Sequence, residues 1–100
     1  MKHNRQTQGQ ADTLYKIAYD MSAFYEDMDP YGARDCMEPD ETTEEFLDRM
    51  AKSVTGAGQL RLELDDWTAW GWTQEPETAQ RINEFRSRLD KLDAGTEAIA

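Results

Sequence analysis

The carboxylates of residues 27–38 have the spacing of a calcium-binding loop. An EF-hand loop places its oxygen ligands at positions 1, 3, 5, 7, 9 and 12 and has a glycine at position 6. Five of these positions are filled by suitable residues, and a helical pattern leads into the loop. They are Asp27, Asp29, Gly32, Asp35 and Glu38, at positions 1, 3, 6, 9 and 12.

Three departures from the pattern count against calcium. Position 5 holds Tyr31, whose neutral phenol is a poor calcium ligand, and position 8 holds the cation Arg34. Pro39 follows position 12 directly and is expected to interrupt the exiting helix that orients the last carboxylate. We find no second EF-hand motif in the sequence that could pair with this one. We therefore expect no metal site, and a degenerate EF-hand-like calcium-binding protein remains as a further alternative.

Residues suited to enzymatic catalysis are scarce. The only histidine, His3, lies in a polar N-terminal segment, and Cys36 is the only cysteine, so a histidine/cysteine zinc site is excluded by count. We can assemble neither a Cys–His pair nor a Ser–His–Asp triad. Neither of the glycine-rich phosphate-binding motifs, GxxxxGK(S/T) and GxGxxG, occurs in the sequence. Paired carboxylates remain possible, but glycosidase-like chemistry needs a cleft that a thin core would not easily shape. We expect no enzyme and no cofactor.

The chain carries no sign of export or membrane insertion. A single cysteine forms no intramolecular disulfide, which fits a reducing cytoplasm. The N-terminal segment has no apolar stretch of the kind found in signal peptides. No run approaches the 18 apolar residues of a membrane span. These features predict a cytoplasmic protein.

Negative charge is concentrated in one part of the sequence. The net charge is −10, and residues 12–48 account for all of it, with 12 acids against Lys16 and Arg34. Such a chain is poorly suited to binding nucleic acid directly, because phosphate contacts need cations. It is suited to a basic partner, including a protein that itself binds nucleic acid. The alternative is an acidic face that is merely solvated.

Apolar spacing predicts a mainly α protein, a compact bundle of three to four helices. Pro30 and Gly32 are expected to end the first helix and open a loop, Thr42 and Glu45 form a capping box, and Gly95 is expected to stop the last helix. The expected helices lie near 12–28, 43–54, 59–70 and 76–93, in a single domain of residues 12–94 between tails of residues 1–11 and 95–100.

Residues 59–70 are the ambiguous segment. Leu60, Leu62 and Leu64 alternate as in a strand, but a lone strand has nothing to pair with, so a helix is favoured. Three tryptophans lie at and just beyond the end of this segment, Trp67, Trp70 and Trp72. Large rings of this kind fill the core of a small bundle or anchor a partner. Trp72 follows Gly71 and is expected to be the most exposed of the three.

The acidic stretch DMDPYGARDCMEPDETTEEFLD and the aromatic stretch DDWTAWGW belong to a 100-residue acidic, helix-rich chain without an enzymatic motif. In this character the chain resembles the small phage and mobile-element inhibitors of bacterial defence, and most closely the type I-F anti-CRISPR proteins. The resemblance rests on no signature motif. It implies stoichiometric binding to an RNA-guided surveillance complex in the bacterial cytoplasm, in several cases by blocking the basic surfaces that take target DNA. It supplies no fold, because folds differ within the group.

The predicted function is therefore a protein inhibitor that mimics DNA and binds a basic, DNA-binding subunit of a CRISPR-Cas surveillance complex. It contacts neither nucleic acid directly nor a membrane. An acidic adaptor, or an antitoxin-like protein that neutralises another basic partner, has the same electrostatics and remains an alternative. The candidate partner-binding residues are Glu26, Asp27, Asp29, Tyr31, Asp35, Glu38, Asp40, Glu41, Glu44, Glu45, Asp48 and Trp72.

Overall fold

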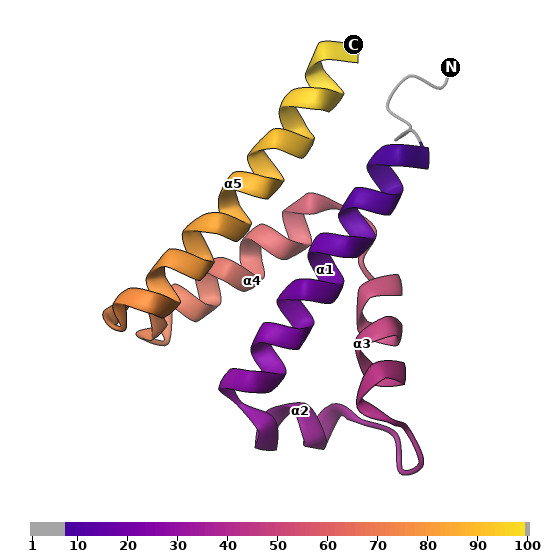
Figure 1. Ribbon diagram of the computed structural model, residues 1–100, viewed down its shortest axis with the longest axis vertical. Helices are drawn as coiled ribbons and strands as arrows, with labels where there is room; N and C mark the ends of the chain where they lie inside the picture. Colours follow the sequence, from indigo (N-terminus) through magenta and orange to yellow (C-terminus); the bar gives the residue numbers. More distant parts are fainter. Residues whose placement is uncertain (1–7, 100) are drawn as a thin grey trace.

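The computed structural model describes residues 8–99, with side chains from 9 to 94. Five α-helices and one short 3-10 helix make up this part of the chain, which contains no strand (Figure 1). The mainly helical class is confirmed, with five helices in place of three to four. The elements are α1 (Gln8–Met28), α2 (Pro30–Cys36), α3 (Thr43–Lys52), α4 (Ala57–Ala69), η1 (Trp72–Gln74) and α5 (Pro76–Ile99).

The helix α1 carries the predicted apolar stripe on its buried face. Leu14, Ile17, Ala18 and Met21 are all at most 4% exposed. The helix ends at Met28, as predicted, but it begins at Gln8, inside the segment expected to be a polar tail. The polar residues of this first turn lack apolar spacing but are compatible with helix, so periodicity alone places the start too late.

The helix α2 occupies the segment that was expected to be a loop. Proline is tolerated in the first turn of a helix, where its missing N–H has no intrahelical partner. Pro30 thus separates α1 from a new helix, and the Asp29 carboxylate caps that helix by accepting a hydrogen bond from the Gly32 N–H at 3.0 Å. The methyl group of Ala33 is completely buried. The calcium-like spacing therefore lies largely on a helix and not on an EF-hand loop.

The helix α3 begins with the predicted capping box. The Thr42 hydroxyl accepts a hydrogen bond from the Glu45 N–H at 3.1 Å, and the Glu45 carboxylate accepts one from the Thr42 N–H at 2.9 Å. Phe46, Leu47 and Ala51 form its buried face. With Ala33 of α2, Phe46 and Leu47 form a small second core.

The segment 59–70 is almost entirely helical, so the helix prediction is confirmed. In α4 the side chains of Leu60, Leu64 and Trp67 are buried, whereas Leu62 is 66% exposed. A strand would have placed all three leucines on one face. The left-handed backbone of Gly71, with φ of 93°, then turns the chain into η1.

The last helix, α5, runs through Gly95 to Ile99, so the predicted stop at Gly95 is wrong. A single glycine costs a helix about 1 kcal/mol relative to alanine, and no proline follows to enforce the end. The buried face of α5 has the predicted spacing. It consists of Ile82, Phe85, Leu89 and Leu92.

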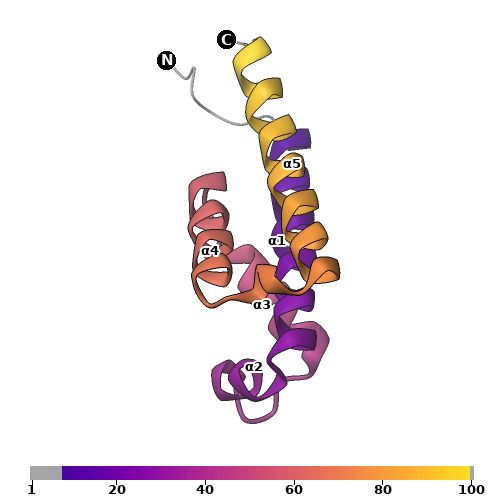
Figure 2. The same cartoon turned by 90° about the vertical axis from the view of Figure 1, so that its left-hand side faces the viewer.

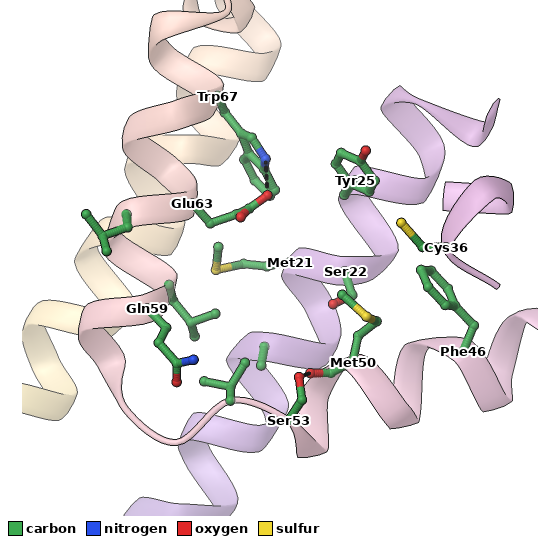
Figure 3. Close-up of a pocket in the computed structure, with 14 residues that line it drawn as sticks. Met21, Ser22, Tyr25, Cys36, Phe46, Met50, Ser53, Gln59, Glu63 and Trp67 are labelled. Atoms are coloured by element: carbon green, nitrogen blue, oxygen red, sulfur yellow. Dashed lines mark hydrogen bonds between the residues drawn. The ribbon is translucent and has the colours of Figure 1, made fainter. Parts of the chain in front are cut away.

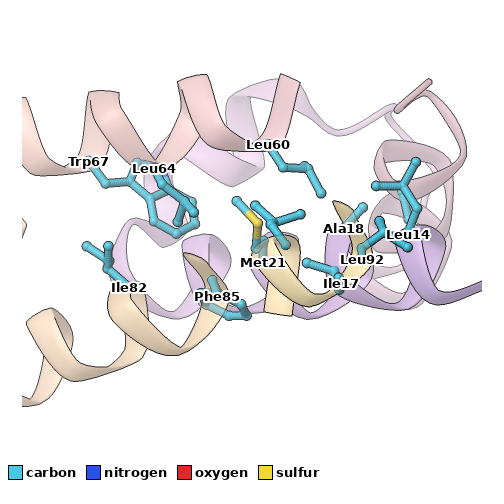
Figure 4. Close-up of a cluster of buried hydrophobic side chains, with 12 residues drawn as sticks. Leu14, Ile17, Ala18, Met21, Leu60, Leu64, Trp67, Ile82, Phe85 and Leu92 are labelled. Carbon is cyan, nitrogen blue, oxygen red and sulfur yellow. The ribbon is translucent and has the colours of Figure 1, made fainter. Parts of the chain in front are cut away.

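The helices form a flat molecule with extents of 43 × 34 × 16 Å. Figure 2 shows α1 and α5 in one layer and α4 set against it. The main core lies between α4 and this layer, where Met21, Leu64, Trp67 and Phe85 meet (Figure 4). The helix α3 packs on α1, whereas α4 packs on α5 and η1. No helix in the described residues is long and apolar enough to cross a bilayer.

Candidate functional site

Most of the predicted partner-binding residues gather at one end of the molecule. This end comprises the C-terminal turn of α1, all of α2, the connecting segment 37–42 and the first turns of α3 (lower part of Figure 1). Trp72 lies elsewhere, in η1. The structure separates the carboxylates of this end into those with partners inside the protein and those that face solvent.

Two of the acids serve as helix caps. Asp29 caps α2, and its second carboxylate oxygen lies 3.4 Å from the Tyr25 hydroxyl, which donates to it. Glu45 closes the capping box of α3. Caps of this kind stabilise a helix by about 1 kcal/mol. Substituting Asp29 or Glu45 would therefore disturb the fold of this end as well as its charge.

Glu41 forms a two-pronged ion pair with Arg49. The guanidinium donates from Nε and Nη2 to the two carboxylate oxygens, at 2.8 Å each, and Nη2 also donates to the Cys36 carbonyl at 2.9 Å. The hydrogen bonds from Arg49, followed by that from the Glu38 N–H, lower the pKa of Glu41 from 4.5 to about 2. Arg49 thereby fixes the segment 37–42 between α2 and α3.

Asp48 joins α3 to α1. Its carboxylate accepts a hydrogen bond from the Tyr15 hydroxyl and forms an ion pair with Lys52 at 2.9 Å. The hydrogen bond from Tyr15 and then that from Lys52 lower the pKa of Asp48. The hydrogen bond to Asp48 in turn raises the pKa of Tyr15. Asp48 thus has a structural role in addition to any role on the surface.

The remaining six carboxylates form no ion pair within the described residues, and five of them are exposed, Glu26 being half-buried. We refer to this set as the acidic end. It consists of Glu26, Asp27, Asp35, Glu38, Asp40 and Glu44.

Arginines pair with five acids outside the acidic end, whereas the exposed Asp66, Glu75 and Glu77 form no ion pair within the described residues. Arg61 pairs with Asp90 at 2.9 Å and with Asp93, which ties α4 to α5. Further pairs reach from α5 to α4, from α5 to α1 and along α5 itself. They are Arg86–Asp65 at 3.0 Å, Arg88–Asp20 at 3.0 Å and Arg81–Glu84 at 3.6 Å. The uneven charge of the sequence therefore becomes an uneven charge in space.

Tyr31 is the aromatic side chain beside the acidic end. It is 76% exposed, and the guanidinium carbon of Arg34 lies 6.0 Å from its ring centroid. A ring held in this way by α2 presents apolar area at little conformational cost. The candidate partner-binding residue Tyr31 thus lies exposed beside the acidic end.

The prediction that Trp72 is the most exposed tryptophan is wrong. Its ring is half-buried, stacked 5.2 Å from the ring of Trp67 and 6.1 Å from that of Tyr25. Trp70 is the exposed ring, at 56%. The cause is the left-handed turn at Gly71, which folds η1 back onto the aromatic cluster. The core interpretation of the tryptophans therefore holds for Trp67 and in part for Trp72.

Sequence reasoning missed an apolar groove of about 450 Å³ between α1, α3 and α4 (Figure 3). Met21 and Tyr25 of α1 form its floor, Phe46 and Met50 of α3 form one wall, and α4 forms the other. The exposed Leu62 stands at its edge. The only sequence signal for this groove was a leucine in α4 that falls outside the buried face.

Among the described residues, no group of three or more histidine, cysteine, aspartate or glutamate side chains is placed to hold a metal ion. Comparison of the chain with protein-family models, with curated proteins and with solved structures finds no match.

Proposed function

We propose that this protein is a stoichiometric inhibitor whose acidic end binds a basic, nucleic-acid-binding surface of a CRISPR-Cas surveillance complex and blocks target DNA. The observation that carries the proposal is that six carboxylates without an internal ion pair gather at one end of the molecule, whereas arginines pair with five acids of α1, α4 and α5. The surveillance complex enters through the resemblance to type I-F anti-CRISPR proteins.

Rigid placement distinguishes these carboxylates from a solvated acidic tail. Asp35 lies on α2, Glu44 lies in the first turn of α3, and Asp40 lies in the turn between them, which Glu41 and Arg49 hold in place. Carboxylates held in this way can occupy a lysine- and arginine-lined channel as the phosphates of DNA do. Their field accelerates association, and Tyr31 supplies the desolvated anchor that charge alone lacks.

The test is target-DNA binding by a purified type I-F surveillance complex, measured against increasing amounts of the full chain. The test variant is Asp35→Lys/Asp40→Lys/Glu44→Lys, which avoids every cap and internal ion pair described above. We expect the concentration needed for inhibition to rise by about tenfold or more, because complementary charge is reversed at the contact. Inhibition by the unaltered chain is also expected to weaken with added salt, since salt screens exposed charges.

The matched control reverses three exposed acids outside the acidic end, as Asp66→Lys/Glu75→Lys/Glu77→Lys. Both variants change the net charge equally, so the control separates a local effect from a general one. The control is expected to inhibit like the unaltered chain. Equal inhibition by the two variants would show that the acidic end is only solvated, and absence of inhibition by the unaltered chain would exclude this complex as partner.

A further inference from the structure

The groove between α1, α3 and α4 exists because its two walls pack on different neighbours. The helix α3 rests on α1, whereas α4 rests on α5 and η1. The walls therefore stand apart over a floor supplied by α1 (Figure 3). The space left between them measures about 450 Å³ and is open to solvent along one side.

The shape of the groove suits a helix. Its α4 wall runs from Gln59 through Glu63 to Trp67, and its α3 wall from Phe46 through Met50 to Ser53, each at helical spacing. The eight steps from Gln59 to Trp67 correspond to about 12 Å, which is the length of about two helical turns. An amphipathic helix that lays its apolar face into such a groove is a recurring mode of protein recognition.

The lining combines aromatic and adaptable apolar side chains. The half-buried side chains of Tyr25 and Met50 offer the accessible apolar area, and the flexible thioether of Met50 fits irregular partners. Met21, Phe46 and Trp67 are at most 2% exposed and form the buried base of the groove. Leu62, 66% exposed, extends the apolar lining to the edge of the groove. A partner that extends beyond the groove would also cover this side chain.

The negative charge of the groove and of the whole chain favours a basic occupant. Glu63 is the one charged side chain among the lining residues, and its carboxylate accepts a single hydrogen bond, from Trp67 Nε1 at 3.0 Å. Its remaining acceptor capacity suits a lysine or arginine on the occupant. A second copy of this chain is disfavoured, because each copy carries a net charge of −10. Cys36 also lines the groove, so the groove reaches α2, the helix that carries Asp35 of the acidic end.

We infer that the groove binds an amphipathic helix of a basic protein partner, with apolar side chains against Tyr25, Met50 and Leu62 and a lysine or arginine beside Glu63. This inference rests on the proposed function for the basic character of the partner. It adds a second contact, so that one partner covers the acidic end through charge and the groove through apolar burial.

The experiment uses a fluorescently labelled amphipathic peptide of leucine and lysine, about 14 residues long, and a leucine–glutamate peptide of the same pattern. Fluorescence anisotropy measures their binding to the full chain. The test variant is Leu62→Glu, and the control is Ala69→Glu, at an exposed position of α4 outside the groove. Each substitution adds one negative charge, so simple attraction would strengthen lysine-peptide binding in both.

We expect the lysine peptide to bind the unaltered chain, to bind Leu62→Glu about tenfold more weakly, and to bind Ala69→Glu undiminished. The glutamate peptide is expected not to bind. Undiminished binding of the lysine peptide to Leu62→Glu would overturn the inference that the groove is the binding site. Failure of the lysine peptide to bind the unaltered chain would overturn it as well. Circular dichroism of both variants checks that the helices are intact.

The acidic-end variant distinguishes this inference from the proposed function. If the lysine peptide no longer binds Asp35→Lys/Asp40→Lys/Glu44→Lys but still binds Leu62→Glu, the acidic end binds basic partners and the groove does not. If Leu62→Glu loses the peptide and the acidic-end variant keeps most of its binding, the groove is the docking site. Equal binding of the two peptides would refute the basic character of the partner and with it the inference.

Discussion

Two leucines of α4 provide a direct test of the fold. Leu64 is completely buried and Leu62 is 66% exposed, although they are two residues apart. In a strand they would share one face, whereas in the helix they lie on opposite sides. The substitutions Leu64→Ala and Leu62→Ala remove the same atoms from these two environments, and alanine favours helix at both positions.

The expected difference is large. Leucine to alanine removes three carbons, which at about 0.8 kcal/mol per buried methylene gives about 2.4 kcal/mol. The cavity left among Met21, Trp67 and Phe85 raises the loss for Leu64→Ala to about 3–4 kcal/mol. For a domain of this size such a loss lowers the melting temperature by roughly 15–25 °C. Leu62→Ala is expected to change stability by no more than about 0.5 kcal/mol.

Urea unfolding followed by far-ultraviolet circular dichroism measures both variants. The dependence of the free energy of unfolding on urea should stay the same, since the surface exposed on unfolding hardly changes. A loss for Leu62→Ala within about 1 kcal/mol of that for Leu64→Ala would refute the helical orientation of α4 and the position of Leu62 at the edge of the groove.

Two further predictions concern charge and backbone. Because the pKa of Glu41 is lowered from 4.5 to about 2 in the folded protein, its ion pair with Arg49 contributes stability above pH 4.5 that is lost as the pH falls toward 2. In urea unfolding at several pH values, the free energy of unfolding of Glu41→Gln should fall less between pH 4.5 and 2 than that of the unaltered chain. Glu44→Gln is the control for removal of a charge. Gly58→Ala should stabilise α4 by about 0.5 kcal/mol, because a new methyl group there meets no atom within 4 Å. Gly71→Ala should destabilise the protein by about 1 kcal/mol, because an L side chain is strained at a φ of 93°. A stabilising Gly71→Ala or a destabilising Gly58→Ala in thermal unfolding would contradict the local geometry.

The sequence predicted those helices whose apolar residues recur at helical spacing. The buried faces of α1, α3 and α5 follow this pattern, and the capping box places the start of α3 correctly. The pattern failed where a residue permits two structures. Pro30 ends one helix and begins another, and Gly95 remains within α5 although glycine often follows a helix end. Local composition alone does not decide such cases, and the start of α2 at Pro30 is accompanied by burial of Ala33 in the second core.

The candidate site was predictable as a region but not residue by residue. The charge run indicates where negative charge is concentrated. It does not indicate that Asp48 accepts a hydrogen bond from Tyr15, 33 residues away, or that Glu41 forms an ion pair with Arg49. The groove is less visible still, because its lining comes from four helices and depends on α3 and α4 packing on different neighbours.

The internal partners explain how one end of a small domain tolerates so many carboxylates. Asp29 lies at the N-terminal end of α2, and Glu44 and Glu45 lie in the first turn of α3, where the helix dipole favours negative charge. Arg49 offsets part of the remaining repulsion. The acids with internal partners hold the backbone in place, whereas those without an internal ion pair, such as Asp35 and Asp40, make no such contribution. Like charges without internal partners lower the stability of a compact state, so their retention on a rigid frame favours a role in binding over a role in folding.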